Sequence, residues 1–259
     1  MNLIGVAAVV LSVMVFAATY QFFRHRSVRV GICFLLGFAL LSVPSVWFAV
    51  DYLHVLGEHA WFYTLRSWPG SEFLVVFLGC AGGVAASLLP RSLRCLPLSA
   101  VLVIAVAPYI KPLIGPISDS AFLDQWKGAV CLQSTPSTCG PASVTTILRH
   151  LGVDTTERAT ARAAYSYSSG TEAWYLARYV RSRGLSPRFD FRSTFSPAAG
   201  LPAVVGVRLG SVGHFIAVLD FHDDQITFAD PLRGEERLSL AEFQRRYEFT
   251  GFHLVIQRS

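Results

Sequence analysis

Residues 1–115 and the rest of the chain differ in their pattern of apolar and polar positions. Four apolar runs dominate the first part: Ile4–Phe23, Val30–Val50, Phe73–Leu89 and Leu98–Ile114, of 20, 21, 17 and 17 residues. A helix needs about 20 apolar residues (range about 17–25) to cross the hydrocarbon core of a bilayer. The pattern therefore predicts four transmembrane helices. We expect the first to be retained, because no Lys or Arg precedes Arg24 to form the basic segment of a signal peptide.

From about Ile117 the apolar positions follow the spacing of helices and then of strands. Helices are predicted over Gly140–Leu151 and Thr156–Ala164, over a segment capped by Thr171 that runs to Gly184, and from Ser239 to about Tyr247. Strands are predicted over Ala203–Leu209, His214–Phe221, Gln225–Ala229 and Phe252–Gln257. Helices followed by an antiparallel sheet predict an α+β fold.

Composition supports this division of the chain. The 259 residues are 53% hydrophobic and 15% charged, whereas soluble domains carry about 25% charged residues. Residues 1–115 hold seven Lys and Arg with three Asp and Glu, and residues 116–259 hold 15 and 14. We therefore expect a four-helix membrane domain at 1–115, a linker at 116–126 and a soluble domain at 127–259. The net charge of +5 lies mainly in the membrane part, so it gives no reason to expect a nucleic-acid partner.

The charged loops predict an orientation. Three arginines between Arg24 and Arg29 follow the first run, and Arg91 and Arg94 follow the third, whereas the loop Asp51–Glu72 carries one arginine and three acidic residues. The positive-inside rule places the two basic loops in the cytoplasm. We therefore expect a multi-pass protein of the cell membrane, typical of a bacterial inner membrane, with the soluble domain outside the cytoplasm. The runs contain no acidic residue or His for a proton or ion path, so the membrane part is interpreted as an anchor.

Two other features of the membrane part allow more than one interpretation. The outer loop is rich in aromatic residues and histidines, which suit either a metal or ligand site or, as we favour, a segment lying at the membrane interface. These residues are His54, His59, Trp61, Tyr63 and Trp68. The GxxxG pattern Gly79–Gly83 permits close helix packing, although such matches are common by chance.

The chemistry is expected in the soluble domain, around Cys139. This residue immediately precedes a predicted helix, where the N-terminal amides stabilise a thiolate and can bind an oxyanion. Gly140 leaves room for a substrate carbonyl to approach. Gln133, six positions before the cysteine, lies close enough for its side-chain amide to act as a second oxyanion donor.

A thiol nucleophile needs a base and a group that orients the base. His214 begins a predicted strand and Asp230 ends the next one, 16 residues later, so a hairpin brings them side by side. A carboxylate there can accept the imidazole N–H and fix its tautomer. The spacing favours this pair over the other candidates for base and orienter, which are His150, His222, His253 and Asp220.

The order of these motifs resembles the bacteriocin-processing peptidases that cleave double-glycine leaders, a family of papain-like cysteine peptidases. The matching motifs are Gln133, Thr138–Ala142, Gly170-Thr171, Gly184-Leu185, Leu201-Pro202, Gly213–Phe215, Ala229–Pro231 and Gly234, within about Gln125–Ile256. The resemblance implies Cys139 as nucleophile, His214 as base, Asp230 as its orienter and Gln133 in the oxyanion hole. It also implies cleavage of a peptide bond through a thioester, with small residues such as Gly-Gly before the cleavage site.

The chain departs from the family pattern in two ways, which leave the substrate open. Many members have Asp before the cysteine, where this chain has Thr138, and many place the peptidase before an exporter with a nucleotide-binding domain. Here the domain follows four membrane helices, and no phosphate-binding loop indicates a nucleotide. The alternatives are a silent papain-like module that binds peptides and an acyltransferase that uses the same triad.

Cys131 allows two further hypotheses. In an oxidising compartment it can form a disulfide with Cys139 that switches the nucleophile off, although a buried small side chain is the favoured interpretation. A zinc site of Cys131, Cys139 and His214 lacks a fourth ligand and any CxxC spacing. We therefore expect no metal and no cofactor; the expected partners are a peptide or protein substrate and the lipid bilayer.

Overall fold

The structure, a computed structural model, describes residues 2–53 and 57–258. Contacts divide the chain into two units, which we describe separately. The helical unit comprises Met1–Gly57 and Trp68–Leu113, and the α+β unit comprises Glu58–Ser67 and Ile114–Ser259. The boundaries expected from the sequence, at 115 and 127, place residues 58–67 with the membrane part, whereas the contacts assign this segment and residues 116–126 to the α+β unit.

Within the described residues, four helices are long and apolar enough to cross a membrane, as the apolar runs predict. They are Leu3–Phe23, Val28–Tyr52, Ser71–Leu88 and Arg91–Ile114. Their parts are α1 (Leu3–Phe23), α2 (Val28–Tyr52), η1 (Ser71–Leu74), α4 (Val75–Leu88), η2 (Arg91–Leu93), α5 (Cys95–Val106), η3 (Ala107–Tyr109) and α6 (Ile110–Ile114). The third and fourth spans exceed their apolar runs, because helical structure begins at the polar residues Ser71 and Arg91.

Two acidic residues lie inside these helices, beyond the ends of the apolar runs. Asp51 is in the last turn of α2 and Glu72 is in η1, and both side chains are buried. Glu72 accepts a hydrogen bond of 3.3 Å from the amide of Asn2. The helices therefore carry buried carboxylates at their ends, which the apolar runs alone do not include.

The glycines of the GxxxG pattern lie where α4 packs against α1. A Cβ atom on Gly79 would collide with the backbone carbonyl of Ser12, and one on Gly83 would collide with that of Phe16. The Ser12 hydroxyl also donates a hydrogen bond of 3.0 Å to the carbonyl of Val75. The pattern therefore allows the backbones of the two helices to approach closely.

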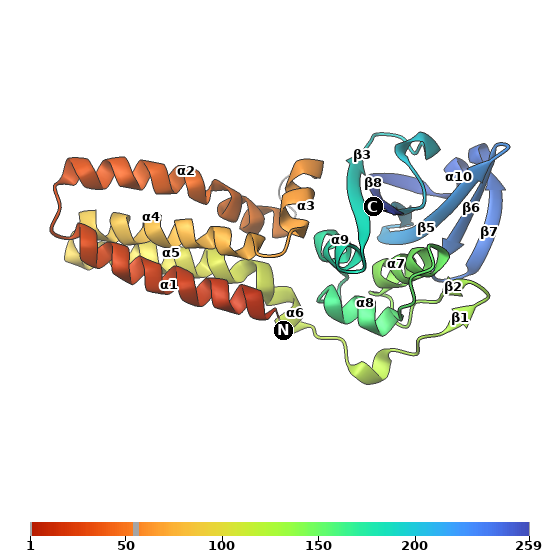
Figure 1. Cartoon of the computed structure of the whole chain (residues 1–259), viewed down its shortest axis with the longest axis horizontal. Helices are drawn as coiled ribbons and strands as arrows, with labels where there is room; N and C mark the ends of the chain where they lie inside the picture. Colours follow the sequence, from red (N-terminus) through yellow and green to blue (C-terminus); the bar gives the residue numbers. More distant parts are fainter. Residues whose placement is uncertain (1, 54–56, 259) are drawn as a thin grey trace. The chain divides into compact units, whose positions relative to one another are not determined.

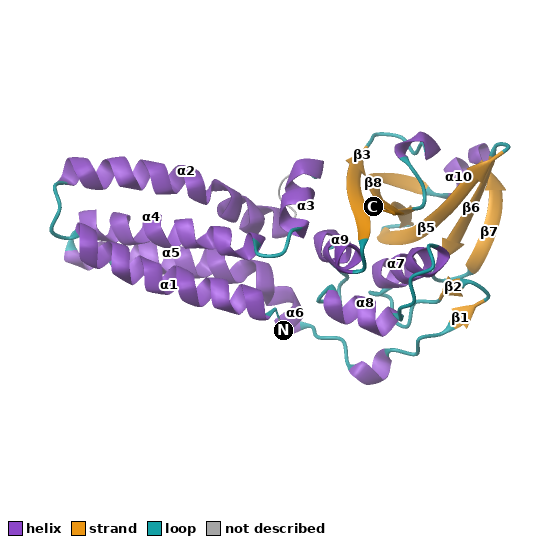
Figure 2. Cartoon of the chain, in the orientation of Figure 1, coloured by secondary structure: helices purple, strands orange, loops and turns teal. Residues whose placement is uncertain are grey.

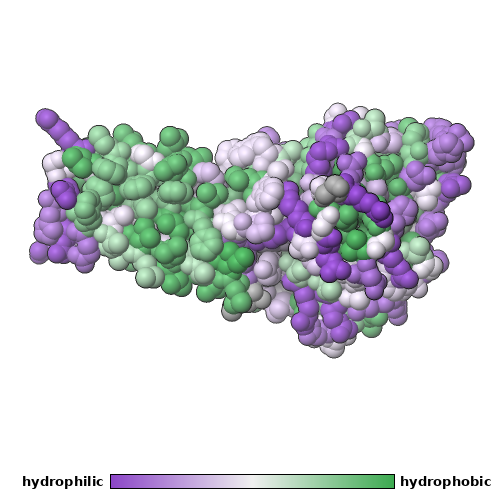
Figure 3. Space-filling model, in the orientation of Figure 1, coloured by the Kyte–Doolittle hydropathy of each residue, from purple (hydrophilic) through white to green (hydrophobic). Residues whose placement is uncertain are grey.

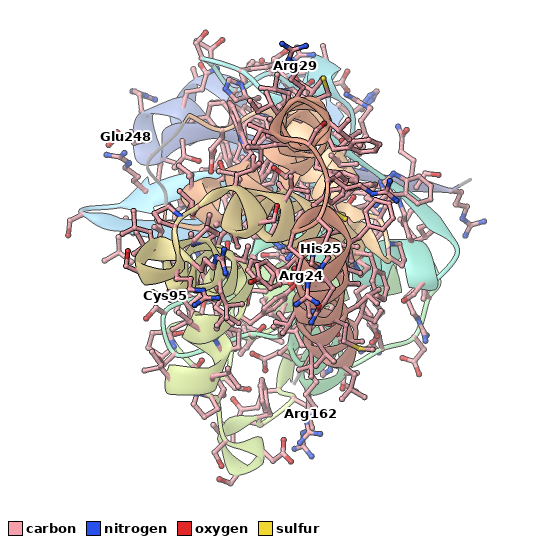
Figure 4. All side chains as sticks on the ribbon, turned by 90° about the vertical axis from the view of Figure 1, so that its left-hand side faces the viewer. Arg24, His25, Arg29, Cys95, Arg162 and Glu248 are labelled. Atoms are coloured by element: carbon pink, nitrogen blue, oxygen red, sulfur yellow. The ribbon has the colours of Figure 1, made fainter. Side chains whose placement is uncertain are left out.

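The two basic turns lie at one end of the helical unit, as the predicted topology requires. Arg94 donates a hydrogen bond of 3.0 Å to the hydroxyl of Tyr20, near the end of α1. Figure 4 looks at this end and shows Arg24, Arg29 and Cys95 around it. Apolar residues, green in Figure 3, cover the flank of the helical unit seen in that view, as expected for a surface in contact with lipid.

The α+β unit combines helices with an antiparallel sheet, as predicted. Its helices are α3 (Ala60–Ser67), α7 (Cys139–His150), α8 (Glu157–Ala163), α9 (Ala173–Ser182) and α10 (Leu240–Arg246), with turns η4 (Asp119–Ala121) and η5 (Pro197–Ala199). Its strands are β1 (Trp126–Lys127), β2 (Val130–Cys131), β3 (Leu185–Phe191), β4 (Ala203–Leu209), β5 (Val212–His222), β6 (Gln225–Asp230), β7 (Gly234–Ser239) and β8 (Glu248–Arg258). In the described part of the chain, the main sheet has the order β3-β8-β4-β5-β6-β7. Figure 1 labels β3, β8, β5, β6 and β7 of this sheet, and Figure 2 shows α7, α8 and α9 grouped on one side of it.

Local signals explain the hairpin turn before β6 and the start of α10. The turn between β5 and β6 holds Asp223 and Asp224 at positive φ, +49° and +60°, as a two-residue type I′ turn requires. Ser239 caps α10, and its side chain and that of Glu242 form the predicted capping box. These short-range features set where β6 begins and where α10 starts.

Other elements differ from the prediction. The N-cap of α9 is Glu172, whereas the hydroxyl of Thr171 bonds to that of Ser166 at 2.7 Å. Strands β3 and β7 are not among the predicted strands. Apolar and polar residues alternate along β3, but Pro187 interrupts it, and β7 contains several charged residues. Strand β8 begins at Glu248, four residues before the predicted start.

One core cluster of the α+β unit lies between the sheet and α10. It contains Phe195, Ala203, Val205, Val207, Ile216, Val218, Ile226, Phe228, Phe243, Tyr247 and Val255. Since alternate residues of a strand share a face, His214 lies in the same row as Ile216, and Asp230 lies in the same row as Phe228. The two polar side chains therefore continue apolar rows at the ends of β5 and β6.

The segment Glu58–Ser67 is part of this unit. Phe62 and Tyr63 of α3 are 1% and 4% exposed. The ring of Tyr63 lies 5.3 Å from that of Trp174 and 5.2 Å from that of Phe191 between ring centroids. These distances are typical of packed aromatic pairs, so α3 contributes to the core on the side of α9 and β3.

The interpretation of this segment as an interfacial aromatic surface is therefore wrong for Tyr63, which is a core residue. Trp61 and Trp68 are 56% and 54% exposed, as an interfacial position would require. His54 lies outside the described residues.

Candidate active site

Cys139 is the first residue of α7, and its side chain is half-buried. The preceding Thr138 does not cap the helix, because its hydroxyl bonds to the amide and the carbonyl of Thr135, at 3.1 and 3.0 Å. The amide of Ala142 donates to the carbonyl of Thr138 at 3.0 Å, and Pro141 has no N–H. Within the described residues, the amides of the first turn without a hydrogen bond are therefore those of Cys139 and Gly140, beside the thiol.

Gly140 lies in a tightly packed position. A Cβ atom there would lie 3.0 Å from Cδ1 of Leu176 and 3.3 Å from Cδ2 of Phe215. The glycine therefore allows close packing of α7 between α9 and β5, and the room for a substrate carbonyl stays a prediction. The contact places the start of α7 beside the strand that carries His214.

His214 and Asp230 lie side by side, as their spacing predicts. Nε2 of His214 is 2.9 Å from Oδ1 of Asp230, and both side chains are buried, at 7% and 0% exposed. Antiparallel pairing of β5 with β6 brings them together, with Ala217 opposite Ala229. Since Nε2 faces the carboxylate, Nδ1 is the ring nitrogen left to face the cysteine.

The surroundings of His214 favour its protonated form. Burial alone lowers the pKa of the imidazole, but hydrogen bonds to Asp230 and Cys139 outweigh it and raise the pKa to about 9. A protonated imidazole beside the sulfur is the arrangement that stabilises a thiolate. The three residues therefore form one interacting group at the end of the sheet.

Asp230 has further partners that the sequence did not indicate. Its Oδ1 also accepts the amide N–H of Leu232 at 2.9 Å, and its Oδ2 accepts the hydroxyl of Tyr247 at 3.1 Å. Burial raises the pKa of the carboxyl, but the hydrogen bonds from His214 and Leu232 hold it below its ordinary value. The group therefore stays ionised opposite His214.

Gln133 lies in the loop that leads to Cys139. Its backbone amide donates to the carbonyl of Pro231 at 3.0 Å, and its side-chain Nε2 donates to the carbonyl of Thr135 at 2.8 Å. An amide nitrogen carries two N–H groups, so one remains after this bond. The loop is thus tied to the turn that follows Asp230.

A buried carboxylate from α8 anchors the same loop. Glu157 is 0% exposed and accepts hydrogen bonds from the backbone amide of Ser134, at 2.8 Å, and from its hydroxyl. The hydroxyl of Ser134 in turn accepts the amide of Leu123 at 2.8 Å. This anchoring fixes the backbone between Gln133 and Cys139.

The sequence model of the Peptidase C39 family matches residues 118–259. The chain belongs to this family. Two uncharacterised proteins are similar to about half of this chain. One, from Methanothermobacter marburgensis, is 36% identical over 126 residues, covering 49% of this chain and 86% of that protein. The other, from Methanothermobacter thermautotrophicus, is 32% identical over 135 residues, covering 50% and 88%.

Solved peptidase structures are also similar to about half of this chain. The peptidase domain of Streptococcus ComA, a bifunctional ABC transporter involved in quorum sensing, is 20% identical with a TM-score of 0.44, covering 50% of this chain and 98% of that domain. A double glycine motif protease from an AMS/PCAT transporter, solved with the leader peptide, is 20% identical with a TM-score of 0.43, covering 50% and 91%. The predicted family and α+β fold are confirmed. The helical unit and α3 lie outside the residues that match the C39 family.

Other histidines of this C39 domain lie apart from Cys139. His150 and His222 are exposed, and His222 pairs with Asp223 at 3.0 Å. His253 is fully buried, and burial lowers its pKa to about 4. Asp220, the other candidate orienter, is exposed. The geometry thus groups His214 with Asp230 and leaves these residues outside the group.

Cys131 is a free, fully buried thiol in β2 of the C39 domain. Burial and the nearby charges of Glu157 and Asp124 raise its pKa to about 12, so it remains protonated at neutral pH. Its backbone amide donates to Thr146 at 3.0 Å. These surroundings agree with a buried small side chain. Among residues 2–53 and 57–258, no group of three His, Cys, Asp or Glu side chains is placed to hold a metal ion.

Proposed function

We propose that the protein is a membrane-anchored cysteine peptidase that cleaves a peptide bond in an exported peptide or protein. Cys139 is the proposed nucleophile, His214 the base, Asp230 its orienter and Gln133 an oxyanion donor. The observation that carries the proposal is the buried 2.9 Å contact of His214 with Asp230. The other interacting partner of His214 is Cys139. Membership of the Peptidase C39 family supports the same chemistry.

The reaction follows from this arrangement. His214 takes the proton of the Cys139 thiol, and the thiolate attacks the substrate carbonyl carbon. The oxygen gains the negative charge and binds the amide N–H of Cys139 and the free N–H of Gln133. The imidazolium then protonates the leaving amine, the C–N bond breaks and a thioester remains. Water attacks the thioester, His214 accepts its proton, and the carboxylic acid and the thiol are released.

The proposed substrate is exported because the C39 domain is proposed to face away from the cytoplasm. The arginine-rich turns around Arg24 and Arg91 support this orientation through the positive-inside rule. The packing of α3 supports the count of spans. Since α3 belongs to the same unit as residues 114–259, an even number of crossings must separate Ser67 from Ile114. Cleavage after small residues such as Gly-Gly is proposed from the family resemblance.

The first experiment measures the reactivity of Cys139 with iodoacetamide. The full chain is solubilised in detergent with the exposed Cys33 and Cys95 replaced by Ser, and alkylation is followed by peptide mass spectrometry. We expect Cys139 to react much faster than a free thiol at near-neutral pH and His214→Ala to slow it. A Cys139 that reacts no faster than a free thiol in the reduced protein would contradict the peptidase function and favour a peptide-binding module.

The second experiment identifies the substrate. The exported peptides of cells that produce the intact protein are compared with those of cells that produce Cys139→Ala. We expect new N- or C-termini that depend on the thiol, and their position gives the cleavage site. Unchanged termini in all exported peptides would count against a processing role. Attachment of the acyl group to an amine or a thiol in place of water would indicate an acyltransferase.

A further inference from the structure

Tyr247 lies behind Asp230, on the side away from His214. It follows the last residue of α10, and its side chain is 3% exposed. The two oxygens of the Asp230 carboxylate have different partners. Oδ1 accepts from His214 and from the amide of Leu232, whereas Oδ2 accepts the hydroxyl of Tyr247 at 3.1 Å. The phenol thus bonds to the oxygen that the imidazole does not use.

We propose that Tyr247 is a positioning residue of the active site, which fixes the carboxylate of Asp230 so that Oδ1 stays directed at His214. A carboxylate with a single side-chain partner can rotate about its Cβ–Cγ bond, because that torsion is broad. A donor on each oxygen removes this freedom. The inference rests on the proposed peptidase function, since it concerns how the orienter of the base is held.

The phenol ring is itself held in place. Its centroid lies 5.6 Å from that of Phe228, edge to face, and 5.3 Å from that of Phe243. The guanidinium of Arg246 lies 5.4 Å from the ring centroid. Because β6 and α10 both contribute to this packing, the position of the hydroxyl does not depend on the contact between Asp230 and His214.

The phenol remains a donor over the pH range of interest. The charged groups that face it are Asp230 of β6, Glu236 of β7 and Arg246 of its own segment. Burial, and then the charge of Asp230, raise the pKa of Tyr247 above its ordinary value. The neutral phenol therefore donates to the carboxylate wherever Asp230 is ionised, and this bond favours the ionised form.

The test compares Tyr247→Phe with the unchanged chain. The rate constant for alkylation of Cys139 by iodoacetamide is measured from acid to neutral pH in the full chain with Cys33→Ser and Cys95→Ser. Phenylalanine keeps the ring and removes the hydroxyl. We expect the acid limb of the profile, where the rate rises with pH, to move to higher pH by about one unit. The rate at a given pH on that limb then falls about tenfold, the size expected for one hydrogen bond to a charged group.

Tyr179→Phe is the matched control. Tyr179 lies on α9, and its hydroxyl forms a hydrogen bond of 2.6 Å with the hydroxyl of Thr155. The substitution therefore also removes a tyrosine hydrogen bond. We expect its pH profile to match that of the unchanged chain. An acid limb that stays in place in Tyr247→Phe, even with a lower unfolding midpoint, would overturn the proposal and indicate a merely structural role.

A second variant separates position from stability. Tyr247→Leu removes both the ring and the hydroxyl. We therefore expect the same shift of the acid limb as in Tyr247→Phe, together with a lower unfolding midpoint. A larger shift of the acid limb in Tyr247→Leu than in Tyr247→Phe, in proportion to the loss of stability, would overturn the proposal. If Cys139 of the unchanged chain reacts no faster than a free thiol, the peptidase function fails. If it reacts fast and Tyr247→Phe matches it, the inference alone fails.

Discussion

The hydroxyl of Ser143 donates a hydrogen bond of 3.1 Å to the backbone carbonyl of Phe215. Ser143 lies one turn after Cys139 on α7, and Phe215 follows His214 on β5. Ser143 is fully buried, so this bond holds α7 against β5. Both residues follow a member of the proposed site in the chain, and the bond involves neither Cys139 nor His214.

We expect Ser143→Ala to lower the reactivity of Cys139 several-fold while the chain still folds. The loss of one buried hydrogen bond costs about 1 kcal/mol, and the distance between sulfur and imidazole becomes less well fixed. The measurement is the rate of iodoacetamide alkylation near neutral pH. Thr145→Val is the control, because Thr145 is on the same helix but bonds to Thr160 of α8 at 2.8 Å. Equal rates in the two variants would contradict the role of Ser143.

Asp230→Asn tests the pairing with His214. The pKa of His214 is raised to about 9 against the effect of burial, with the Asp230 hydrogen bond as the main favourable cause. Without the negative charge we expect that pKa to fall below its usual value of about 6.5, because burial then dominates. Histidine-selective NMR titration of the solubilised chain, with His214→Ala to assign the signal, gives the pKa. An unchanged titration would contradict the pairing.

The same shift predicts how stability depends on pH. Since folding raises the pKa of His214, the folded state binds its proton more tightly than the unfolded state. The stabilisation is complete below a pH of about 6.5 and is lost as the pH rises through about 9. We expect His214→Ala to show a flatter stability curve between these values in chemical unfolding. His222→Gln, at an exposed imidazole, should keep the slope of the unchanged chain.

Short-range signals account for what the sequence predicts well. Strand Ala203–Leu209 is found with its predicted bounds, and the Asp223-Asp224 turn and the Ser239 cap fix the ends of neighbouring elements. These features depend on residues a few positions apart. The polar strand β7 pairs through its backbone with β6, so its side chains carry little of the signal that identifies it.

Contacts over long sequence separations account for what the sequence does not predict. His214 and Asp230 are found because each stands beside a turn signal at a strand end. Tyr247 is 17 residues from Asp230 and reaches it only once α10 has folded back over the sheet. The packing of α3 on α9 joins residues more than 100 positions apart, such as Tyr63 and Trp174, and no local pattern indicates it.

We expect Tyr63→Ala to destabilise the α+β unit by about 3–5 kcal/mol, the usual cost of removing a buried aromatic side chain. Its ring packs on Trp174, Phe189 and Phe191, so the truncation leaves a cavity. Chemical unfolding of the full chain in detergent gives the change. Trp61→Ala is the control, since this neighbour is 56% exposed. Similar stabilities of the two variants would show that α3 does not contribute to the core.

Gly83→Val tests the packing of α1 on α4. Because a Cβ atom at Gly83 would collide with the backbone carbonyl of Phe16 and the hydroxyl of Thr19, the two helices must move apart. We expect a lower thermal stability of the solubilised helical unit, measured by loss of monodisperse protein on heating. Gly37→Val is the control, because a Cβ atom at Gly37 would meet no atom within 4 Å. Equal losses in both variants would assign the effect to β-branching alone.

The buried imidazole of His253 predicts a loss of stability in acid. Its ring stacks on that of Phe195, with 5.5 Å between the centroids, and both ring nitrogens lack a hydrogen-bond partner within the described residues. Burial lowers the pKa of His253 to about 4, although the charge of Asp190 opposes this effect. The unfolded chain therefore takes up the proton first, and stability falls as the pH drops from about 6.5 towards 4, by up to about 1.4 kcal/mol per pH unit.

We expect His253→Phe to reduce this acid slope, because phenylalanine fits among the neighbouring rings and takes up no proton. Chemical unfolding at a series of pH values between neutral and mildly acid measures the slope for the unchanged chain and for the variant. His222→Gln serves again as the control, since its side chain is 81% exposed. Asp230 also loses stabilisation in acid, because folding lowers its pKa, and this contribution is common to all three chains. The difference in slope between His253→Phe and the unchanged chain therefore isolates His253, and identical slopes would contradict its neutral state in the fold.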